Sequence, residues 1–374
     1  MGFLVSSICK VFFSFVEYLK DGIGMKIKLL RLLPVIGLLI LAGCGGGGSS
    51  SIPASSEIVG ITTDGTNTQY PTLYITDFGL NLVESINSQT GVITAIAGQS
   101  GVIGTNTNAA GTGAQFNGPE GIILSSGSLY IADAYNYAIR KIAGLTATST
   151  VTTLSGVLGT PGNVDTAQGS PEYGNPKNVA TDGSNFYVTD YANNTVRKIT
   201  SAGTVTTLAS GFSGPWGIVI DPTNTYLYVT DTGNNNIKQI TISTGSVITF
   251  AGTIGGNSGV PGTGTANGTA AFFNSPLGIA IDASGNNLYV ADSGNNAIRQ
   301  ITIAGSQTVS TVAGSTSGAA GTGTSANGST GATSLFSTPI NLAYSQNGNL
   351  YVVDQNGLII RVVNISTGAT SNLP

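Results

Sequence analysis

The sequence predicts an all-β fold, a six-bladed β-propeller with four antiparallel strands in each blade. Three observations lead to this prediction. A short apolar phrase that ends in Asp recurs six times, a Pro-containing opener precedes five of the copies, and apolar runs alternate with Gly-rich stretches. Regular recurrence of a unit of four short strands is typical of propellers.

The repeated phrase is clearest in residues 286–302, which read NNLYVADSGNNAIRQIT. Side chains alternate across a strand, so Leu288 and Val290 should face one neighbouring blade and Tyr289 the other. A polar turn follows the Asp, and two further strands such as AIRQITI and VSTVAG complete the unit. The Asp that closes each second strand is Asp77, Asp133, Asp190, Asp231, Asp292 or Asp354.

The openers and the spacing between repeats define the first strands and the interblade loops. The openers read FNGPEGIIL, YGNPKNVATD, FSGPWGIVID, FNSPLGIAID and FSTPINLAYS, and the first repeat has only IVGITTD. Successive aspartates are 56, 57, 41, 61 and 62 residues apart. The longer steps contain Gly-, Thr- and Asn-rich insertions, which we interpret as loops between blades.

The N-terminal region predicts export and lipidation. From Met25 the chain has a basic start, an apolar run over residues 32–41 that is too short to span a bilayer, and then Leu41-Ala42-Gly43-Cys44. This ending resembles the lipobox of bacterial lipoproteins, which implies cleavage before Cys44 and a lipid on its sulfur. Residues 1–24 are then an upstream extension or a start assigned too early, and residues 25–43 are the signal peptide.

The segment after the signal peptide is expected to be a tether. Residues 44–57 contain the Gly- and Ser-rich run GGGGSSSIPASS, which spans about 20 Å as a flexible coil. Gly45 stands where lipoproteins retained at the inner membrane have Asp, so the resemblance implies an outer-membrane or cell-surface location in the cell envelope. No Cys follows Cys44, so the propeller must be stable without disulfides.

The phrase P-x-G-I-A-x-D followed by G-N-L-Y-V-A-D-x-G-N-N-x-I-R resembles the NHL-repeat family over residues 58–374. This resemblance implies a propeller built from these repeats. The sequence departs from the pattern in the first repeat, which lacks the opening Pro, and at Asn178 and Asn341, which replace the Gly after Pro-x. The way in which the first and last blades close the ring therefore stays open.

A basic residue stands seven positions after the Asp in five repeats. Across a hairpin this spacing brings the two side chains together, so we expect ion pairs within the blades and no catalytic role for them. The first repeat has Glu84 at this position. The five bases are Arg140, Arg197, Lys238, Arg299 and Arg361.

The composition excludes several kinds of chemistry. The chain contains no His, which removes Ser-His-Asp and Cys-His catalysis and the commonest zinc ligand. Amidating lyases and streptogramin lyases share the expected fold, but their histidines have no counterpart here, so we exclude both activities. After residue 44 there are 8 Lys and Arg residues and 15 Asp and Glu residues, a net charge of −7, which argues against nucleic acid as partner.

Two kinds of site remain open. One is a calcium-type hydrolase or lactonase site in the central channel, with oxygen ligands from Glu120, Asn178 and Asn341. The other is a recognition surface, because the turns after the second strands and the interblade loops should emerge on one face. Its candidate residues are the aromatic side chains after the Asp and the residues after the opening Pro: Phe78, Tyr135, Tyr137, Tyr191, Trp216, Glu120 and Lys177.

The sequence therefore favours a surface-anchored, non-catalytic propeller that binds a protein, peptide or glycan through the loop-bearing face. We expect it to be monomeric, without a cofactor, and attached to the membrane only through its lipid. The alternative is the metal-assisted hydrolase with calcium in the channel. A third interpretation is a structural element of an envelope assembly.

Overall fold

The computed structural model describes residues 56–65, 69–107, 110–165, 170–253, 266–314, 327–328, 334–355 and 359–374. The expected extension, signal peptide, lipidated Cys44 and most of the tether lie outside these residues. Within the described part of the chain, no helix has the length and hydropathy needed to cross a bilayer.

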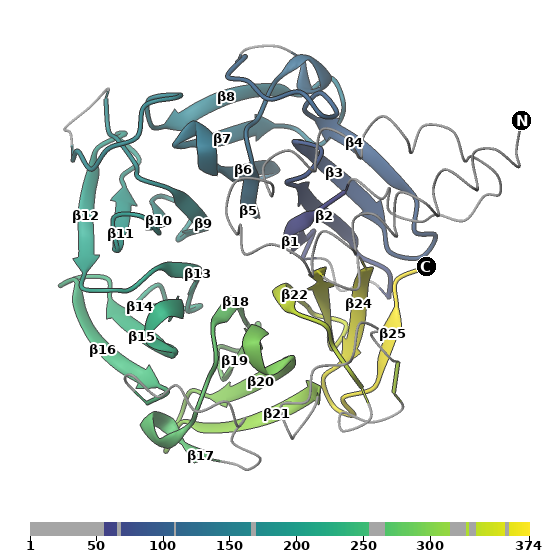
Figure 1. Ribbon diagram of the computed structural model, residues 1–374, viewed down its shortest axis with the longest axis vertical. Coiled ribbons are helices and arrows are strands. Elements are labelled where there is room, and N and C mark those ends of the chain that lie inside the picture. Colours follow the sequence, from purple (N-terminus) through teal and green to yellow (C-terminus); the bar gives the residue numbers. More distant parts are fainter. Residues whose placement is uncertain are drawn as a thin grey trace, which may run out of the picture. The chain divides into compact units, whose positions relative to one another are not determined.

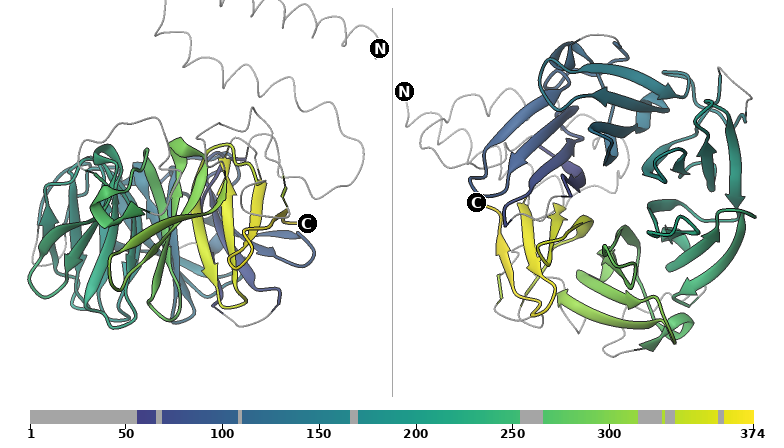
Figure 2. Two further views of the ribbon diagram at one scale, coloured as in Figure 1. Left: turned by 90° about the horizontal axis from the view of Figure 1, so that it is seen from below. Right: turned by 180° about the vertical axis from the view of Figure 1, so that it is seen from behind.

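Six antiparallel sheets stand around a common axis and form a six-bladed propeller, as the sequence predicts (Figure 1). The first strand of each blade lies nearest the axis, and the strands run roughly along the axis when the ring is seen edge-on (Figure 2). Each sheet consists of one contiguous segment of chain, so the ring closes by contact between blades and not by an exchanged strand.

The first three blades contain twelve strands. Blade one is β1 (Ile58–Thr63), β2 (Thr72–Asp77), β3 (Leu82–Asn87) and β4 (Ile93–Ala97). Blade two is β5 (Pro119–Ser125), β6 (Ser128–Asp133), β7 (Ala138–Ala143) and β8 (Thr150–Ser155). Blade three is β9 (Pro176–Thr181), β10 (Phe186–Asp190), β11 (Thr195–Ile199) and β12 (Val205–Ser210).

The last three blades contain thirteen strands. Blade four is β13 (Pro215–Ile220), β14 (Tyr226–Asp231), β15 (Asn236–Thr241) and β16 (Ser246–Ala251). Blade five is β18 (Pro276–Ile281), β19 (Asn287–Asp292), β20 (Ala297–Thr302), β21 (Thr308–Gly314) and the short β17 (Ala266–Asn267). Blade six is β22 (Pro339–Ser345), β23 (Asn349–Asp354), β24 (Ile359–Asn364) and β25 (Thr370–Asn372).

Strand β17 corrects one detail of the sequence prediction. The insertion before blade five was expected to be loop throughout, yet Ala266 pairs with Val309 and Asn267 with Thr308 at the outer edge of β21. A two-residue strand leaves no periodic pattern in the sequence. The short turn η5 (Gly268–Ala270) follows it directly.

The hydrophobic core lies between blades. Leu288 and Val290 pack in the cluster shared with blade four, whereas Tyr289 packs in the cluster shared with blade six. The predicted alternation is thus confirmed, and it explains why these strands are apolar at nearly every position. Each blade packs one face against each of its two neighbours, so burial of one strand stabilises two interfaces at once.

The predicted ion pairs within blades are confirmed in four blades. The distances from the Arg nitrogen to the Asp oxygen are 2.9 Å for Arg140 and Asp133, 3.4 Å for Arg197 and Asp190, 3.1 Å for Arg299 and Asp292, and 3.7 Å for Arg361 and Asp354. All eight side chains are buried. In blade four, Lys238 donates instead to the Thr249 hydroxyl at 2.8 Å.

Each of the four arginines also holds the loop that precedes its blade. The guanidinium donates to the carbonyl four residues before the opening Pro, for example from Arg140 to Gln115 at 3.1 Å and from Arg197 to Glu172 at 3.1 Å. It lies over the aromatic ring three residues before that Pro. These rings are Phe116, Tyr173, Phe273 and Phe336, with centroid distances of 5.2, 5.4, 5.6 and 4.5 Å.

Blade one differs at the same position. Glu84 replaces the Arg and lies near the buried carboxylate of Asp77. Burial and, to a smaller extent, the negative charge of Asp77 together raise the pKa of Glu84 to about 7. Asp77 accepts hydrogen bonds from the Ser56 hydroxyl and the Glu57 N–H, so the entry of the chain into the ring is tied to this acidic pair.

Arg299→Ala should lower the free energy of unfolding by about 3–5 kcal/mol, because it leaves the Asp292 carboxylate buried without its cation. Lys238→Ala is the comparison, since Lys238 has the same place in blade four but bonds to a hydroxyl and acts on Asp231 only through its charge. It should cost about 1 kcal/mol. Equal losses for the two variants in urea unfolding would contradict the structural role of the pair.

Glu84→Gln should stabilise the propeller at pH 8 and have little effect at pH 4. The pKa of Glu84 is raised in the folded state, so its stabilising contribution is full below the unfolded value of about 4.3 and is lost as the pH rises through about 7. Melting temperatures of the wild type and the variant between pH 4 and 8 test this. A difference that does not change with pH would argue against it.

Candidate functional site

The candidate site lies on the face that carries the turns after the second strands and the interblade loops, which we call the loop face. The turn η3 (Ala134–Asn136) in blade two touches the opener of the same blade, because Tyr135 N–H donates to the Asn117 carbonyl at 3.0 Å. In blade one, Gly101 N–H donates to the Leu80 carbonyl at 2.8 Å, which joins an interblade loop to a turn. The expectation that turns and loops share one face is confirmed.

Two tyrosines of the loop face are exposed and seated on glycine backbone. The side chain of Tyr135 is 44% exposed and that of Tyr191 is 42% exposed. A Cβ on Gly118 would lie 2.6 Å from the Tyr135 ring, and one on Gly214 would lie 2.7 Å from the Tyr191 ring. Only glycine allows the rings to lie this close to the backbone, so both tyrosines present firmly supported surfaces.

Phe78 supports this arrangement from blade one. Its ring meets the Tyr135 ring edge to face, with centroids 5.7 Å apart. Phe78 is itself partly buried against the apolar cluster between blades one and six. It therefore braces Tyr135 and offers little surface of its own.

Glu120 and Lys177 form an ion pair between blades two and three. The Lys177 amine contacts the Glu120 carboxylate and lies 5.4 Å from the centroid of the Tyr191 ring. The Lys177 side chain is only 14% exposed and the Glu120 side chain only 4%. Burial raises the pKa of Glu120, and the Lys177 ammonium opposes that effect. The pair presents no net charge to a ligand.

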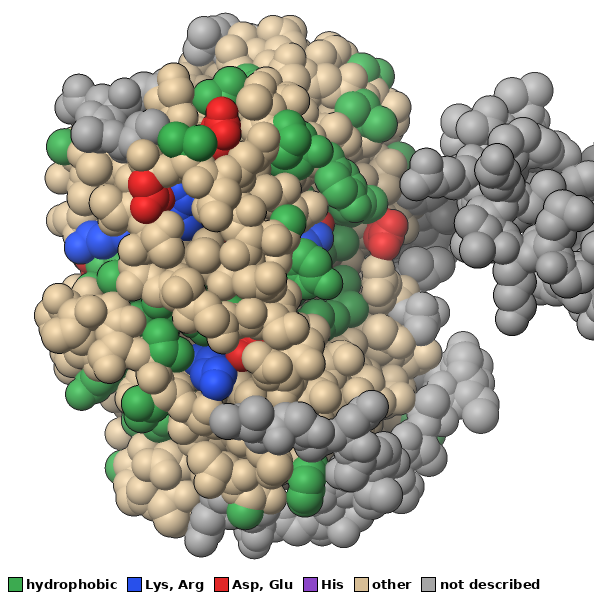
Figure 3. Space-filling model, turned by 60° about the vertical axis from the view of Figure 1, so that its left-hand side comes forward, with side chains coloured by type: hydrophobic (Ala, Val, Ile, Leu, Met, Phe, Trp, Pro, Cys, Tyr) green, Lys and Arg blue, Asp and Glu red, His purple; other side chains and the backbone are tan. Residues whose placement is uncertain are grey.

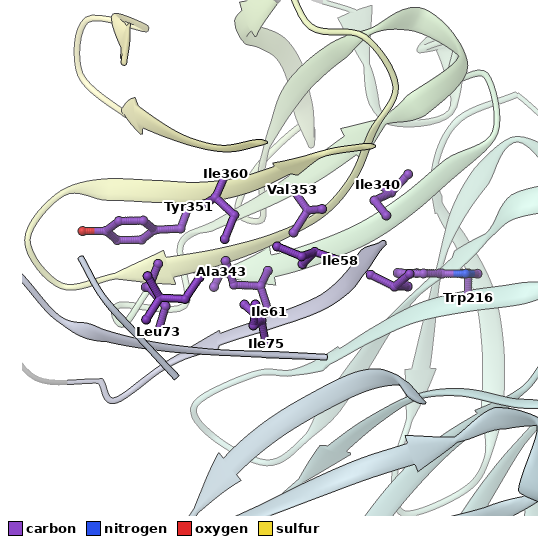
Figure 4. Packing of buried hydrophobic residues seen from close by; sticks show 12 residues of the cluster. Ile58, Ile61, Leu73, Ile75, Trp216, Ile340, Ala343, Tyr351, Val353 and Ile360 are labelled. Carbon is purple, nitrogen blue, oxygen red and sulfur yellow. The ribbon is translucent and has the colours of Figure 1, made fainter. Parts of the chain in front are cut away.

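Trp216 does not lie beside these tyrosines at the surface, and the sequence-based expectation is wrong for this residue. It is 7% exposed and belongs to one apolar cluster with Val59 and Ile340, against which Leu277 also packs. In Figure 4, Trp216 and Ile340 lie at one end of this cluster and Tyr351 at the other. Repeat periodicity places Trp216 correctly in its strand but cannot show that its ring meets blades one and six across the axis.

The residues after the opening Pro therefore close one end of the channel. Val59, Trp216, Leu277 and Ile340 occupy equivalent positions in four blades and form its apolar part. The Glu120 and Lys177 pair occupies the same position in the other two. The channel beyond them holds a cavity of about 190 Å³, lined by inner-strand residues that carry no charged side chain among those described.

The three proposed calcium ligands do not fit a metal site. Asn178 and Asn341 line the channel, but each Oδ1 accepts the N–H of the next residue, at 2.8 and 2.9 Å. Asn341 Nδ2 also donates to the Val59 carbonyl at 3.0 Å, which helps to close the ring. Glu120 is held by Lys177 and does not line this cavity. Among the described residues, no three acidic side chains gather closely enough to hold an ion.

Tyr137 ends the η3 turn in the left-handed conformation, with φ of 57°, and is half-buried. It thus lies on the loop face, in the same turn as Tyr135. Sequence reasoning grouped it with the other aromatic residues of this face. Its place in the turn sets Tyr137 apart from those residues. The equivalent residue is Asn in every other blade where the structure describes it.

Sequence reasoning missed a second cavity, a groove of about 420 Å³ between blades four and five. Its lining includes Tyr226, Ile248 and Ile303. Its lining comes from separate segments of two blades, so only the packed structure can show it. Figure 3 shows that charged side chains are few and scattered on the visible side, where backbone and uncharged polar groups dominate.

Comparison with known proteins supports the fold. No curated protein matches the chain. A structure from Bacteroides thetaiotaomicron, described as a protein of unknown function, is 17% identical over 85% of this chain and 72% of its own, with a TM-score of 0.60. An auxiliary nutrient binding protein from Bacteroides ovatus is 15% identical over 84% of this chain and 69% of its own, with a TM-score of 0.59.

A streptogramin B lyase is also similar, at 17% identity over 86% of this chain and 84% of its own, with a TM-score of 0.52. These low identities show a shared fold and no more. The sequence evidence is more specific, because the Teneurin NHL domain profile matches residues 173–366, which span blades three to six. This match covers more than half of the chain, and the protein therefore belongs to the Teneurin NHL domain family.

Proposed function

We propose that the propeller is a non-catalytic binding module that recognises a protein, peptide or glycan on the loop face of blades one to three. The observation that carries this proposal is the pair of exposed tyrosines, Tyr135 and Tyr191, each seated on glycine backbone. Tyrosine offers a large, rigid contact area at a low cost in conformational entropy. A ring that is already held in place loses little freedom when a ligand binds.

Two further features support a binding role. The sequence contains no His, and of the polar side chains near the channel, Glu120 and Lys177 bond each other while Asn178 and Asn341 bond backbone groups. Similar folds include proteins described as auxiliary nutrient binding proteins, which is compatible with a propeller that binds a ligand outside the cytoplasm. Recognition by surface loops on a rigid scaffold is a common use of such folds.

We also propose that this module is held at the cell envelope by a lipid on Cys44. The sequence from Met25 to Cys44 supports this, together with the Gly- and Ser-rich run that follows. A tether of about 20 Å would let the propeller reach ligands near the membrane surface.

Tyr135→Ala and Tyr191→Ala, combined in one variant, should weaken ligand binding by about 30-fold or more, because truncation of a recognition aromatic typically costs about 2 kcal/mol. The melting temperature should fall by about 4 °C or less, since both rings are exposed. Retention of envelope components on immobilised wild type and variant, followed by titration of the retained fraction, measures the change.

Tyr70→Ala is the control for this experiment. Tyr70 is 48% exposed, but it lies in the β1–β2 connection, at the strand ends opposite the loop face. Its removal should leave ligand retention unchanged. Equal retention by the double variant and the wild type would exclude the proposed surface.

Cys44→Ser should move the protein from the membrane fraction to the soluble fraction without changing the melting temperature of the propeller. The reason is that Cys44 is the only thiol after the expected cleavage and would be the sole attachment point. Carbonate washing of membranes followed by immunoblotting measures this. A variant that stays in the washed membranes would mean that residues before Cys44 are retained as an anchor.

A further inference from the structure

Asparagines in the left-handed conformation join neighbouring blades on the loop face. Each ends the turn after a second strand, four positions after the closing Asp, and its Oδ1 accepts the N–H of the residue before the opening Pro of the next blade. We call this contact the Asn latch. The latches are Asn81 to Gly118 at 2.9 Å, Asn194 to Gly214 at 2.7 Å, Asn235 to Ser275 at 2.7 Å and Asn296 to Thr338 at 2.8 Å.

The latch goes with an unusual backbone conformation in the next blade. The residues that donate to it have φ of 62°, 61°, 48° and 70° in Gly118, Gly214, Ser275 and Thr338. For Ser275 and Thr338 this conformation is strained, because a side chain rarely adopts positive φ. The hydrogen bond to Asn helps to hold the backbone there. The latch is therefore a structural device that repeats around the ring.

Among the five blades whose residue at this position is described, blade two alone lacks the latch; blade six has Leu358 there, outside the described residues. Tyr137 stands at the Asn position with φ of 57°, although a bulky aromatic residue is costly there and Asn is favoured. Its side chain has no amide oxygen to accept the N–H of Asn175 in blade three. That N–H donates instead to Asp190 at 2.9 Å, and Asn175 is not among the residues with positive φ. The Asn175 Oδ1 is buried without a hydrogen-bond partner in the described structure.

The junction without a latch coincides with the candidate site. Tyr135 belongs to the same turn as Tyr137, Tyr191 follows in the next blade, and the Glu120 and Lys177 pair bridges the same two blades. A residue that breaks a repeated structural rule at a functional surface is best explained by function. This coincidence rests on the proposed function, since it presumes that the loop face binds a ligand.

We infer that the binding site is centred on the junction of blades two and three, that Tyr137 is a recognition residue there, and that the ligand is a neutral saccharide chain. The surface offers tyrosine rings whose flat apolar faces suit the C–H faces of sugar rings, and hydroxyl groups that suit sugar hydroxyls. Glu120 and Lys177 cancel each other in a buried pair, and the loop before blade three adds Asp165, which is paired with Arg197, and Glu172, so the described charges do not favour an anionic ligand. Gly-, Thr- and Asn-rich loops around them supply amide and hydroxyl groups.

A protein partner fits this surface less well. Protein hot spots insert apolar or aromatic side chains into well-packed pockets. The two cavities described above, in the channel and between blades four and five, are lined by residues other than these tyrosines. A saccharide chain can lie across rigid rings on an open surface without such a pocket.

The first arm of the test needs no ligand. Tyr137→Asn should melt at or above the wild-type temperature, because Asn suits the left-handed conformation and Tyr137 is not needed for folding. Asn235→Tyr makes the reverse exchange at the junction of blades four and five. It should lower the melting temperature by about 2–6 °C, through loss of a latch and strain in the turn. Asn235→Ala replaces it if the tyrosine variant does not fold.

The second arm measures binding of cellohexaose, maltohexaose and chitohexaose by calorimetry, with hexagalacturonate as the charged comparison. The full propeller should bind at least one neutral hexasaccharide, with an affinity that does not change with salt. Tyr137→Asn should weaken that binding by about tenfold or more, whereas Asn235→Tyr should leave it unchanged. Tyr137→Phe should bind more tightly than Tyr137→Asn, since it keeps the ring.

The outcomes separate the inference from the proposed function. A melting temperature of Tyr137→Asn more than about 2 °C below wild type would make Tyr137 a structural residue and overturn the inference. Binding lost in the Tyr135 and Tyr191 variant but retained in Tyr137→Asn would overturn it while the loop face stands as the site. Failure of all three neutral saccharides, or salt-dependent binding of hexagalacturonate alone, would overturn the ligand class.

Discussion

A buried carboxylate at the end of each second strand is the constraint on which the rest of the propeller depends. Asp133 is an example. Its carboxylate accepts hydrogen bonds from the N–H of Asn117 in the opener, the side-chain amide of Asn136 in the turn, and the guanidinium of Arg140 in the third strand. One side chain thus fixes three segments of backbone relative to each other. Because a buried charge without partners is costly, each of these segments is held in place.

The basic residue seven positions after the Asp depends on the length of the connection that precedes the blade. Arg stands in blades two, three, five and six, which follow long Gly-rich insertions, and its guanidinium binds loop carbonyls as well as Asp. Blade four follows a short connection between β12 and β13, where no long loop needs to be held, and it has Lys238. Gly-rich loops bury little apolar surface, so hydrogen bonds from a rigid fork of donors are an effective way to order them. Tyr135 rests on Gly118, at the end of a loop ordered in this way by Arg140.

Much of this architecture could be predicted from the sequence, because a propeller repeats local information. The strand order, the side of each blade that Leu288 and Tyr289 face, and the Asp and Arg pairs all follow from spacing within one unit. Contacts across the axis cannot be predicted from the spacing within one unit. Trp216 meets Val59 and Ile340 from distant blades, and no pattern within a repeat distinguishes that burial from exposure on the rim. The Asn latch was also hidden, since Asn in a turn is already explained by its backbone preference.

Because the blades repeat, each position of the loop face has an expected residue with a structural role. A position where another residue stands is then a candidate for function. A departure alone is not enough, as Asn341 shows: it replaces the Gly of the repeat, yet its side-chain amide helps to close the ring. Tyr137 is different because its departure removes a contact and no described contact replaces it, while Asn175 in the next blade takes another conformation. A substitution that removes a structural hydrogen bond next to exposed aromatic rings points to a function. A substitution that adds a structural contact does not. By this criterion the junction of blades two and three is where we place the proposed binding site.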